Sequence, residues 1–243
     1  MTRFNKRIDF RQSDNASNGK TNRKKKKAPS LPPKDRAEAN RILDALYDRN
    51  PLLGLCCEMS AMTGLRYSDA SWLRYDDFYD ENGCFVESLT VCQQKVFNMR
   101  IGRKEKPLPE NLAFRKSNVT VYTNSEIQRI VEDTRAFSNG SEYLFANKRS
   151  RVTLPTGEII DRPMSVESAA EHHNAVKKQL NITWALGTHS WRKYFASLLV
   201  KNGATVEKIR DLLGQTSLVS TNAYLVSFSN DLKNHVNQLS LGE

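Results

Sequence analysis

Apolar residues recur every three or four positions along most of the chain, which is the spacing of helices with one buried face. In the first such segment Ile42, Leu43 and Leu46 share a face, and Asn50-Pro51 interrupts the pattern. Residues 51–62 are apolar nearly all round, which predicts a helix buried on every side. The predicted helices cover residues 35–49, 51–62, 68–73 with Ser68 as N-cap, 125 onward, 165–180, 189–200, 205–213 and 217–224.

Two segments show strand spacing instead. Residues 84–95 carry apolar pairs at Phe85-Val86 and then Leu89 and Val91, and residues 118–122 alternate between polar and apolar. These segments predict a small antiparallel sheet, so the expected fold class is mainly α with a small antiparallel β-sheet (α+β). Residues 97–117 separate the two strands as a long, basic loop.

The basic residues are concentrated at the N-terminus. The chain has 243 residues and a formal net charge of +10, which suggests a polyanionic partner. Residues 1–34 carry eleven Lys/Arg and two Asp, whereas residues 35–243 carry 26 basic and 25 acidic side chains. We interpret residues 1–34 as a disorder-prone arm, with Lys24, Lys25, Lys26 and Lys27 either as phosphate contacts or as part of a solubilising tail.

The cysteines and the hydropathy pattern exclude several classes of protein. Cys56 and Cys57 lie in an apolar run, as small core residues do, and the sequence has no Cys-x-x-Cys and no cysteine–histidine zinc spacing. We therefore expect no metal, no cofactor and no disulfide. The sequence also has no apolar signal core and no apolar run of 18 residues, so we expect a cytoplasmic protein with no membrane contact.

Short polar motifs stand at the ends of the predicted elements. The motifs are Thr63-Gly64-Leu65-Arg66, Gln93-Gln94-Lys95, His189-Ser190-Trp191-Arg192, and Leu212-Leu213-Gly214-Gln215 followed by Tyr224. An arginine fork can hold two phosphate oxygens, a histidine can move a proton, and a tyrosine oxygen can attack phosphorus. This set of residue types can cleave a phosphodiester without a metal ion or a nucleotide cofactor.

In order and local pattern, these motifs resemble the catalytic domain of the tyrosine recombinases, the phage integrase family. The resemblance implies the fold of that domain over residues 35–226, with residues 227–243 as a tail that either docks on a neighbouring subunit or packs on its own core. Most of the family has a further helical domain before the catalytic one. Only a basic segment precedes Asp35 here, so the chain resembles the compact members or a shortened chain.

The resemblance also assigns catalytic roles. Arg66 and Arg192 match the arginines that clamp the scissile phosphate, His189 matches the histidine between them, and Tyr224 matches the nucleophile. Asp69 matches an acidic position that supports Arg66 outside the chemistry. Gln215 departs from the histidine usual at its position, which implies a hydrogen-bonding role with partial loss of activity, or a degenerate member.

The remaining assignment is the lysine that protonates the leaving 5′-oxygen. Lys95 matches the Gln-Lys form of the family motif, with Lys104 and Lys106 as rivals. We further expect Arg103, Lys104 and Lys193 to contact DNA. The family places the lysine at the tip of a β-hairpin, whereas residues 97–117 are longer and more basic than such hairpins usually are. We expect this extra loop to contact DNA or a neighbouring subunit.

The function implied by the resemblance is site-specific recombination of DNA through a 3′-phosphotyrosyl intermediate, for integration and excision, inversion or resolution. The partners implied are double-stranded DNA, a homotetramer on paired sites and DNA-bending accessory proteins, with nucleoid association in the cytoplasm. One alternative is a telomere resolvase or type IB topoisomerase. Another is a non-enzymatic DNA-binding protein in which residues 205–224 form a helix-turn-helix.

Overall fold

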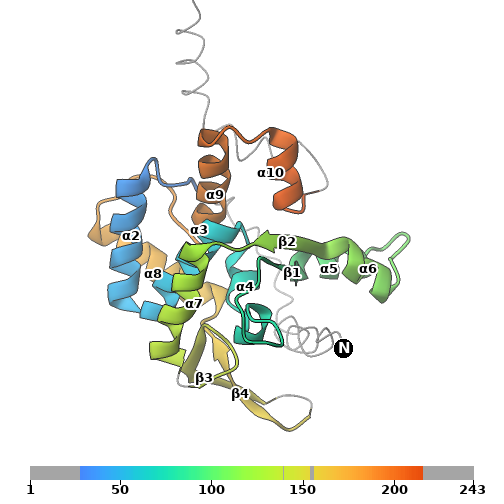
Figure 1. Cartoon of the computed structure of the whole chain (residues 1–243). Coiled ribbons are helices and arrows are strands. Elements are labelled where there is room, and N and C mark those ends of the chain that lie inside the picture. The colour runs from blue at the N-terminus through green and yellow to red at the C-terminus, as the bar shows by residue number, and fades with distance from the viewer. Residues whose placement is uncertain (1–27, 139, 154–155, 216–243) are drawn as a thin grey trace, which may run out of the picture.

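The structure, a computed structural model, describes residues 28–138, 140–153 and 156–215. Within these ranges it is mainly helical with two small antiparallel sheets, as predicted (Figure 1). The elements are α2 (Arg36–Arg49), α3 (Pro51–Thr63), α4 (Tyr67–Ala70), the 3-10 helix η1 (Tyr75–Asp77), β1 (Ser88–Cys92), α5 (Gln94–Ile101), α6 (Glu110–Ser117), β2 (Asn118–Tyr122), α7 (Ser125–Ser138), β3 (Ala146–Thr153), β4 (Ile159–Pro163), α8 (Val166–Gln179), α9 (His189–Lys201) and α10 (Val206–Leu212).

Helix α3 is the centre of the fold. Its apolar residues are buried on all sides, because α2, α7 and α9 all pack against it. A β-carbon at Gly54 would lie 2.7 Å from the backbone of Tyr47, so the absence of a side chain there allows α2 and α3 to approach closely. Asn50 ends α2 and caps α3, its side-chain oxygen accepting from the amide of Leu53 at 2.9 Å.

Strands β1 and β2 form the predicted antiparallel pair, with Val91 opposite Val119 and Cys92 opposite Asn118. The segment between them is not a loop. It folds into the helical hairpin α5–α6, held by an apolar cluster of Phe97, Ala113 and their neighbours, and this hairpin projects from one side of the domain (Figure 1). The prediction failed because the apolar positions of this segment are few and separated by charged residues.

Three further details differ from the sequence prediction. The N-cap of helix α4 lies two residues earlier than expected, at Arg66 rather than at Ser68. The hairpin β3–β4 was not predicted, because its strands are polar and its register is interrupted between Asn147 and Arg151. Of the residues assigned to the arm, Ala28 to Lys34 lie on the domain, where the amide of Leu31 donates to the carbonyl of Ala185 at 3.0 Å.

Two predictions fall outside the described residues: the helix over 217–224 and the tail over 227–243. In the ranges that the structure describes, no helix combines the length and the apolar character needed to cross a bilayer. The cysteines at positions 56, 57, 84 and 92 are all described and form no disulfide with one another, and Cys56 and Cys57 are buried in the core as expected.

Candidate active site

Arg66 stands at the turn between α3 and α4. Gly64 ends α3 in the left-handed region, at φ 68°, and a β-carbon there would also collide with the ring of Phe195 at 2.5 Å. The turn leaves the side chain of Arg66 16% exposed, with Nη1 3.9 Å from a carboxylate oxygen of the fully buried Asp69. Asp69 also accepts from the backbone amide of Gln94 at 3.1 Å. Asp69 therefore joins the arginine turn to the start of α5.

Arg192 lies on α9 and is completely buried. Its Nη1 donates to the carbonyl of Gly64 at 2.5 Å, and its Nη2 donates to the carbonyl of Leu213 at 2.7 Å. These two carbonyls belong to the helix ends on either side of the site, at the C-termini of α3 and α10. The guanidinium thus fixes the position of three segments that are far apart in the sequence.

Gln93 connects the two arginines and was missed by sequence reasoning. Its Oε1 accepts from Nη1 of Arg66 at 2.5 Å, and its Nε2 donates to the carbonyl of Leu213 at 2.8 Å, the same oxygen that Arg192 contacts. The side chain is 1% exposed. The signal lay in the strand pattern, because Leu89, Val91 and Gln93 share the inward phase and only Gln93 is polar.

His189 begins α9 and faces the same cluster of cations, while its side chain keeps contact with solvent. Partial removal of water by the surrounding protein, followed by the positive charges of Arg192, Arg66, Lys95 and Lys193, lowers the pKa of His189 to about 4. The imidazole is therefore neutral near pH 7, with a ring nitrogen able to accept a proton.

Trp191 anchors the same helix from its buried side. Its indole Nε1 donates to Nε2 of His173 on α8 at 2.9 Å, and Nδ1 of His173 lies 2.7 Å from the carbonyl of Ala169. Because indole only donates, His173 is the neutral tautomer with its proton on Nδ1. Sγ of Cys57 on α3 lies 3.7 Å from the same Nε2. Helices α3, α8 and α9 thus meet at one imidazole, directly behind His189 and Arg192.

The structure separates the three candidate lysines. Lys95 is exposed on the first turn of α5, one of the cations close enough to His189 to lower its pKa. Lys104 and Lys106 are exposed in the connection between α5 and α6, at the far end of the projecting hairpin (Figure 1). This placement favours Lys95 as the lysine of the site. Lys95 lies on a helix, whereas the first predicted strand segment extended to this residue.

The remaining predicted residues are distributed as follows. Nζ of Lys193 donates to the carbonyl of Ser30 at 2.6 Å, so this ammonium binds the segment preceding α2. Gln215 is half-buried after Gly214, and its backbone amide donates to the carbonyl of Arg210 at 3.0 Å. Arg103 is exposed beside Lys104. Tyr224 and the lysines at positions 24–27 lie outside the described residues.

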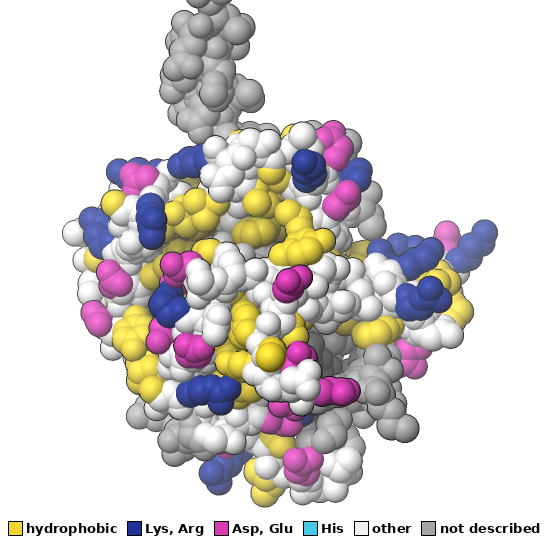
Figure 2. Space-filling model, in the orientation of Figure 1, with side chains coloured by type: hydrophobic (Ala, Val, Ile, Leu, Met, Phe, Trp, Pro, Cys, Tyr) yellow, Lys and Arg dark blue, Asp and Glu magenta, His cyan; other side chains and the backbone are white. Residues whose placement is uncertain are grey.

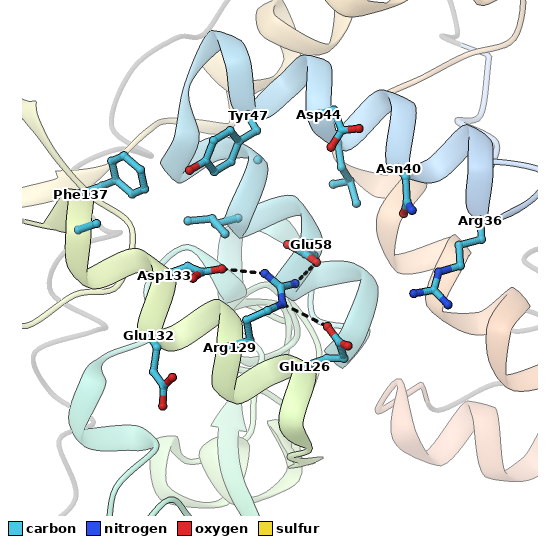
Figure 3. A pocket seen from close by; sticks show the side chains of 14 residues that line it. Arg36, Asn40, Asp44, Tyr47, Glu58, Glu126, Arg129, Glu132, Asp133 and Phe137 are labelled. Carbon is cyan, nitrogen blue, oxygen red and sulfur yellow. Dashed lines mark hydrogen bonds and ion pairs between the residues drawn. The ribbon is translucent and has the colours of Figure 1, made fainter.

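A cavity of about 730 Å³ lies elsewhere, between α2, α3 and α7 (Figure 3). Arg129 lies within it and forms ion pairs with Glu58, Glu126 and Asp133, where the figure shows the dashed contacts. None of the predicted site residues lines this cavity, so it is separate from the arginine cluster. In the part of the chain that the structure describes, no group of three or more His, Cys, Asp or Glu side chains could hold a metal ion.

The chain resembles tyrosine recombinases of known sequence. It is 27% identical over 193 residues to the tyrosine recombinase XerC of Halalkalibacterium halodurans, covering 77% of this chain and 55% of the relative. It is 28% identical over 193 residues to the tyrosine recombinase XerD of Bifidobacterium longum, with the same two shares. The chain therefore spans about half the length of the curated relatives it matches.

Solved structures share the fold. The crystal structure of XerA recombinase has a TM-score of 0.58 at 17% identity, covering 88% of this chain and 68% of that one. The Tn1549 transposon integrase in complex with a circular intermediate DNA has a TM-score of 0.57 at 14% identity, covering 87% and 67%. The model of the phage integrase family matches residues 35–230, which is most of the 243-residue chain. The chain therefore belongs to the phage integrase family.

Proposed function

We propose that this chain is a site-specific recombinase that cuts and rejoins duplex DNA through a 3′-phosphotyrosyl intermediate. The observation that carries the proposal is the convergence of Arg66 and Arg192 on one hydrogen-bonded frame, made by Gln93 and the carbonyl of Leu213. His189 and Lys95 stand beside that frame. A cluster of cations suits a phosphodiester, whose negative charge increases in the transition state, and Asp69 is the carboxylate that pairs with Arg66 among the described residues.

Each residue has a defined task in this mechanism. Arg66, which is partly exposed, contacts the non-bridging oxygens of the scissile phosphate. Arg192, which is fully buried, supports the same site by holding the carbonyls of Gly64 and Leu213. The Oη of Tyr224 forms a bond to phosphorus while the bond from phosphorus to the 5′-oxygen breaks. The phenolic proton passes to His189, and the departing 5′-oxygen takes a proton from Lys95. A 5′-hydroxyl of the partner duplex then reverses these steps.

The low pKa of His189 is compatible with the role of a base. In the free protein, partial burial and then the surrounding cations keep the imidazole neutral, with a pKa of about 4. A phosphodiester bound among those cations adds negative charge next to the ring, so the pKa of His189 rises toward its ordinary value when DNA is bound. The substrate thereby increases the basicity of the group that accepts the proton of Tyr224.

The proposed partners are duplex DNA with specific sites, a homotetramer that holds two sites, and accessory proteins that bend DNA. Support for the DNA partner comes from similar solved structures, which include XerH bound to difH substrate and a lambda integrase dimer bound to a core site. The rival of a non-enzymatic DNA-binding protein gives no task to Gln93 or to Asp69, both of which are buried beside Arg66.

Covalent capture tests the proposal. The protein is incubated with nicked DNA fragments from the replicon that carries its gene, denatured in detergent, and separated by size. We expect a protein–DNA adduct that Tyr224→Phe abolishes while DNA binding is retained. Tyr122→Phe is the matched control, because Tyr122 is 66% exposed on β2 and has no assigned role. Equal adduct from Tyr224→Phe and wild type, or no adduct from either, contradicts the proposal.

A further inference from the structure

The helical hairpin α5–α6 has a net positive charge, whereas the rest of residues 35–243 has a net negative charge. Residues 94–117 contain seven Lys/Arg and two Glu, whereas the rest of residues 35–243 contains 19 basic and 23 acidic side chains. The exposed cations of the hairpin are Lys95, Arg103, Lys104, Lys106, Arg115 and Lys116. Figure 2 shows this concentration of dark blue side chains on the projecting part of the molecule.

The hairpin is a folded unit attached directly to the active site. Helix α5 starts just after β1 and α6 ends just before β2, and the backbone amide of Gln93 extends the β1–β2 ladder by donating to the carbonyl of Ser117 at 2.8 Å. Gln93 and the amide of Gln94 are bonded to Arg66 and to Asp69, respectively. The apolar cluster around Phe97 and Ala113 then packs α5 on α6. The direction of the hairpin is therefore fixed relative to the arginine that contacts phosphate.

One cation lies inside the hairpin rather than on it. Arg100 is 8% exposed, and its Nη1 donates to Oγ of Ser117 at 3.3 Å. Among the described residues no carboxylate forms an ion pair with it. Burial and the positive charge of Arg103 lower the pKa of Arg100 below its ordinary value. Arg103 follows α5 in the connection to α6, so an anion bound at the tip of the hairpin offsets the repulsion between Arg100 and Arg103.

We infer that α5–α6 is a second DNA-holding element, which binds the phosphate backbone beside the scissile phosphate and supplies affinity rather than chemistry. The inference rests on the proposed function only for the position of the scissile phosphate. Helix α5 has eight residues and is about 12 Å long, which corresponds to about three to four base pairs of duplex. The cations at its root and at its tip therefore contact phosphates about three to four base pairs apart on the same DNA flank.

Salt-dependent binding of the full chain to a labelled 30-base-pair duplex tests the inference without knowledge of the recombination site. The tip variant Arg103→Gln/Lys104→Gln/Lys106→Gln removes three exposed cations. We expect the slope of log K against log salt to become shallower by about 2.7, and the affinity at 0.1 M salt to fall at least about tenfold. A second variant, Arg115→Gln/Lys116→Gln, is expected to remove about 1.8 of the slope.

The matched control removes three exposed cations from the opposite side of the domain, as Arg41→Gln/Arg49→Gln/Lys178→Gln on α2 and α8 (Figure 1). We expect it to change the slope by less than half as much as the tip variant. If the control and the tip variant reduce the slope equally, the net charge of the protein alone determines DNA binding, and this overturns the inference. Unchanged slopes in both hairpin variants also overturn the inference. If those variants lose only assembly on paired sites, the hairpin is a contact between subunits and not a DNA-holding element.

The result is separable from the test of the proposed function. The binding slope is measured on intact duplex and needs no cleavage, so Tyr224→Phe is expected to give the same slope as wild type. Failure of the proposed function would remove the adduct from every variant and leave the difference in binding slope. Equal thermal melts of wild type and both hairpin variants, whose changed side chains are exposed, establish that the comparison is made between folded proteins.

Discussion

Acidification is expected to destabilise this domain through His173, which is hydrogen-bonded to Trp191 of α9. Burial, together with the positive charge of His172, lowers the pKa of His173 to about 4, against the opposing effect of the hydrogen bond to Ala169. In the unfolded chain the pKa is about 6.5. Below pH 6.5 the unfolded state therefore binds a proton that the folded state does not, and the free energy of unfolding decreases with falling pH until the pH reaches about 4.

The magnitude follows from the two pKa values. Each unit of difference corresponds to about 1.4 kcal/mol, so His173 destabilises the fold by about 2 kcal/mol between pH 7 and pH 4.5 and by about 3 kcal/mol at still lower pH. The structural cause is the indole of Trp191. Its N–H points at Nε2 of His173 at 2.9 Å, so a proton on that nitrogen breaks the hydrogen bond between α8 and α9.

Urea unfolding followed by tryptophan fluorescence at pH 7 and at pH 4.5 measures the effect. We expect wild type to lose about 2 kcal/mol more than His173→Gln, which cannot take up the proton. His172→Gln is the matched control, because this neighbour on α8 is only half-buried and is not bonded to Trp191. The reasoning is refuted if wild type and His173→Gln lose stability in parallel, or if NMR titration places the pKa of His173 in the folded protein near 6.5.

Three further predictions concern the site. Gln93→Ala is expected to slow single-turnover cleavage about 10- to 100-fold with DNA binding retained, because Arg66 loses its orienting partner. Gln94→Ala is the control with a smaller expected effect, because the side chain of Gln94 bonds to Asn98. Gly214→Ala is expected to lower the free energy of unfolding in urea by about 3 kcal/mol, since its β-carbon would lie 2.2 Å from Val119 at a φ of 59°; Gly203→Ala, at φ 78° with open space around it, costs about 1 kcal/mol. Lys95→Ala is expected to cleave ordinary DNA slowly and to recover on DNA with a sulfur leaving group at the 5′-bridging position, which departs without a proton, while Lys104→Ala behaves as wild type on both. Failure of the sulfur substrate to rescue Lys95→Ala would assign the proton to another residue.

The arginines, the histidine and the helical fold could be predicted from the sequence, because each has a local signal. A glycine that ends an apolar helix predicts the turn that presents Arg66, and helical spacing puts His189 and Arg192 on one face. The hairpin α5–α6 could not be predicted in the same way. Its helices have eight residues each and little apolar surface of their own, so they depend on packing against each other.

The sequence by itself determined which chemical groups this protein possesses and in what order they occur, since motif spacing and residue type are properties of the chain. Only the tertiary structure decided which of those groups share one site. Gln93 acquires its role because its side-chain amide reaches both Arg66 and the carbonyl of Leu213. Lys95 is distinguished from Lys104 by the direction in which the hairpin α5–α6 projects. Such relations depend on contacts between segments distant in sequence, and neither periodicity nor local spacing encodes them.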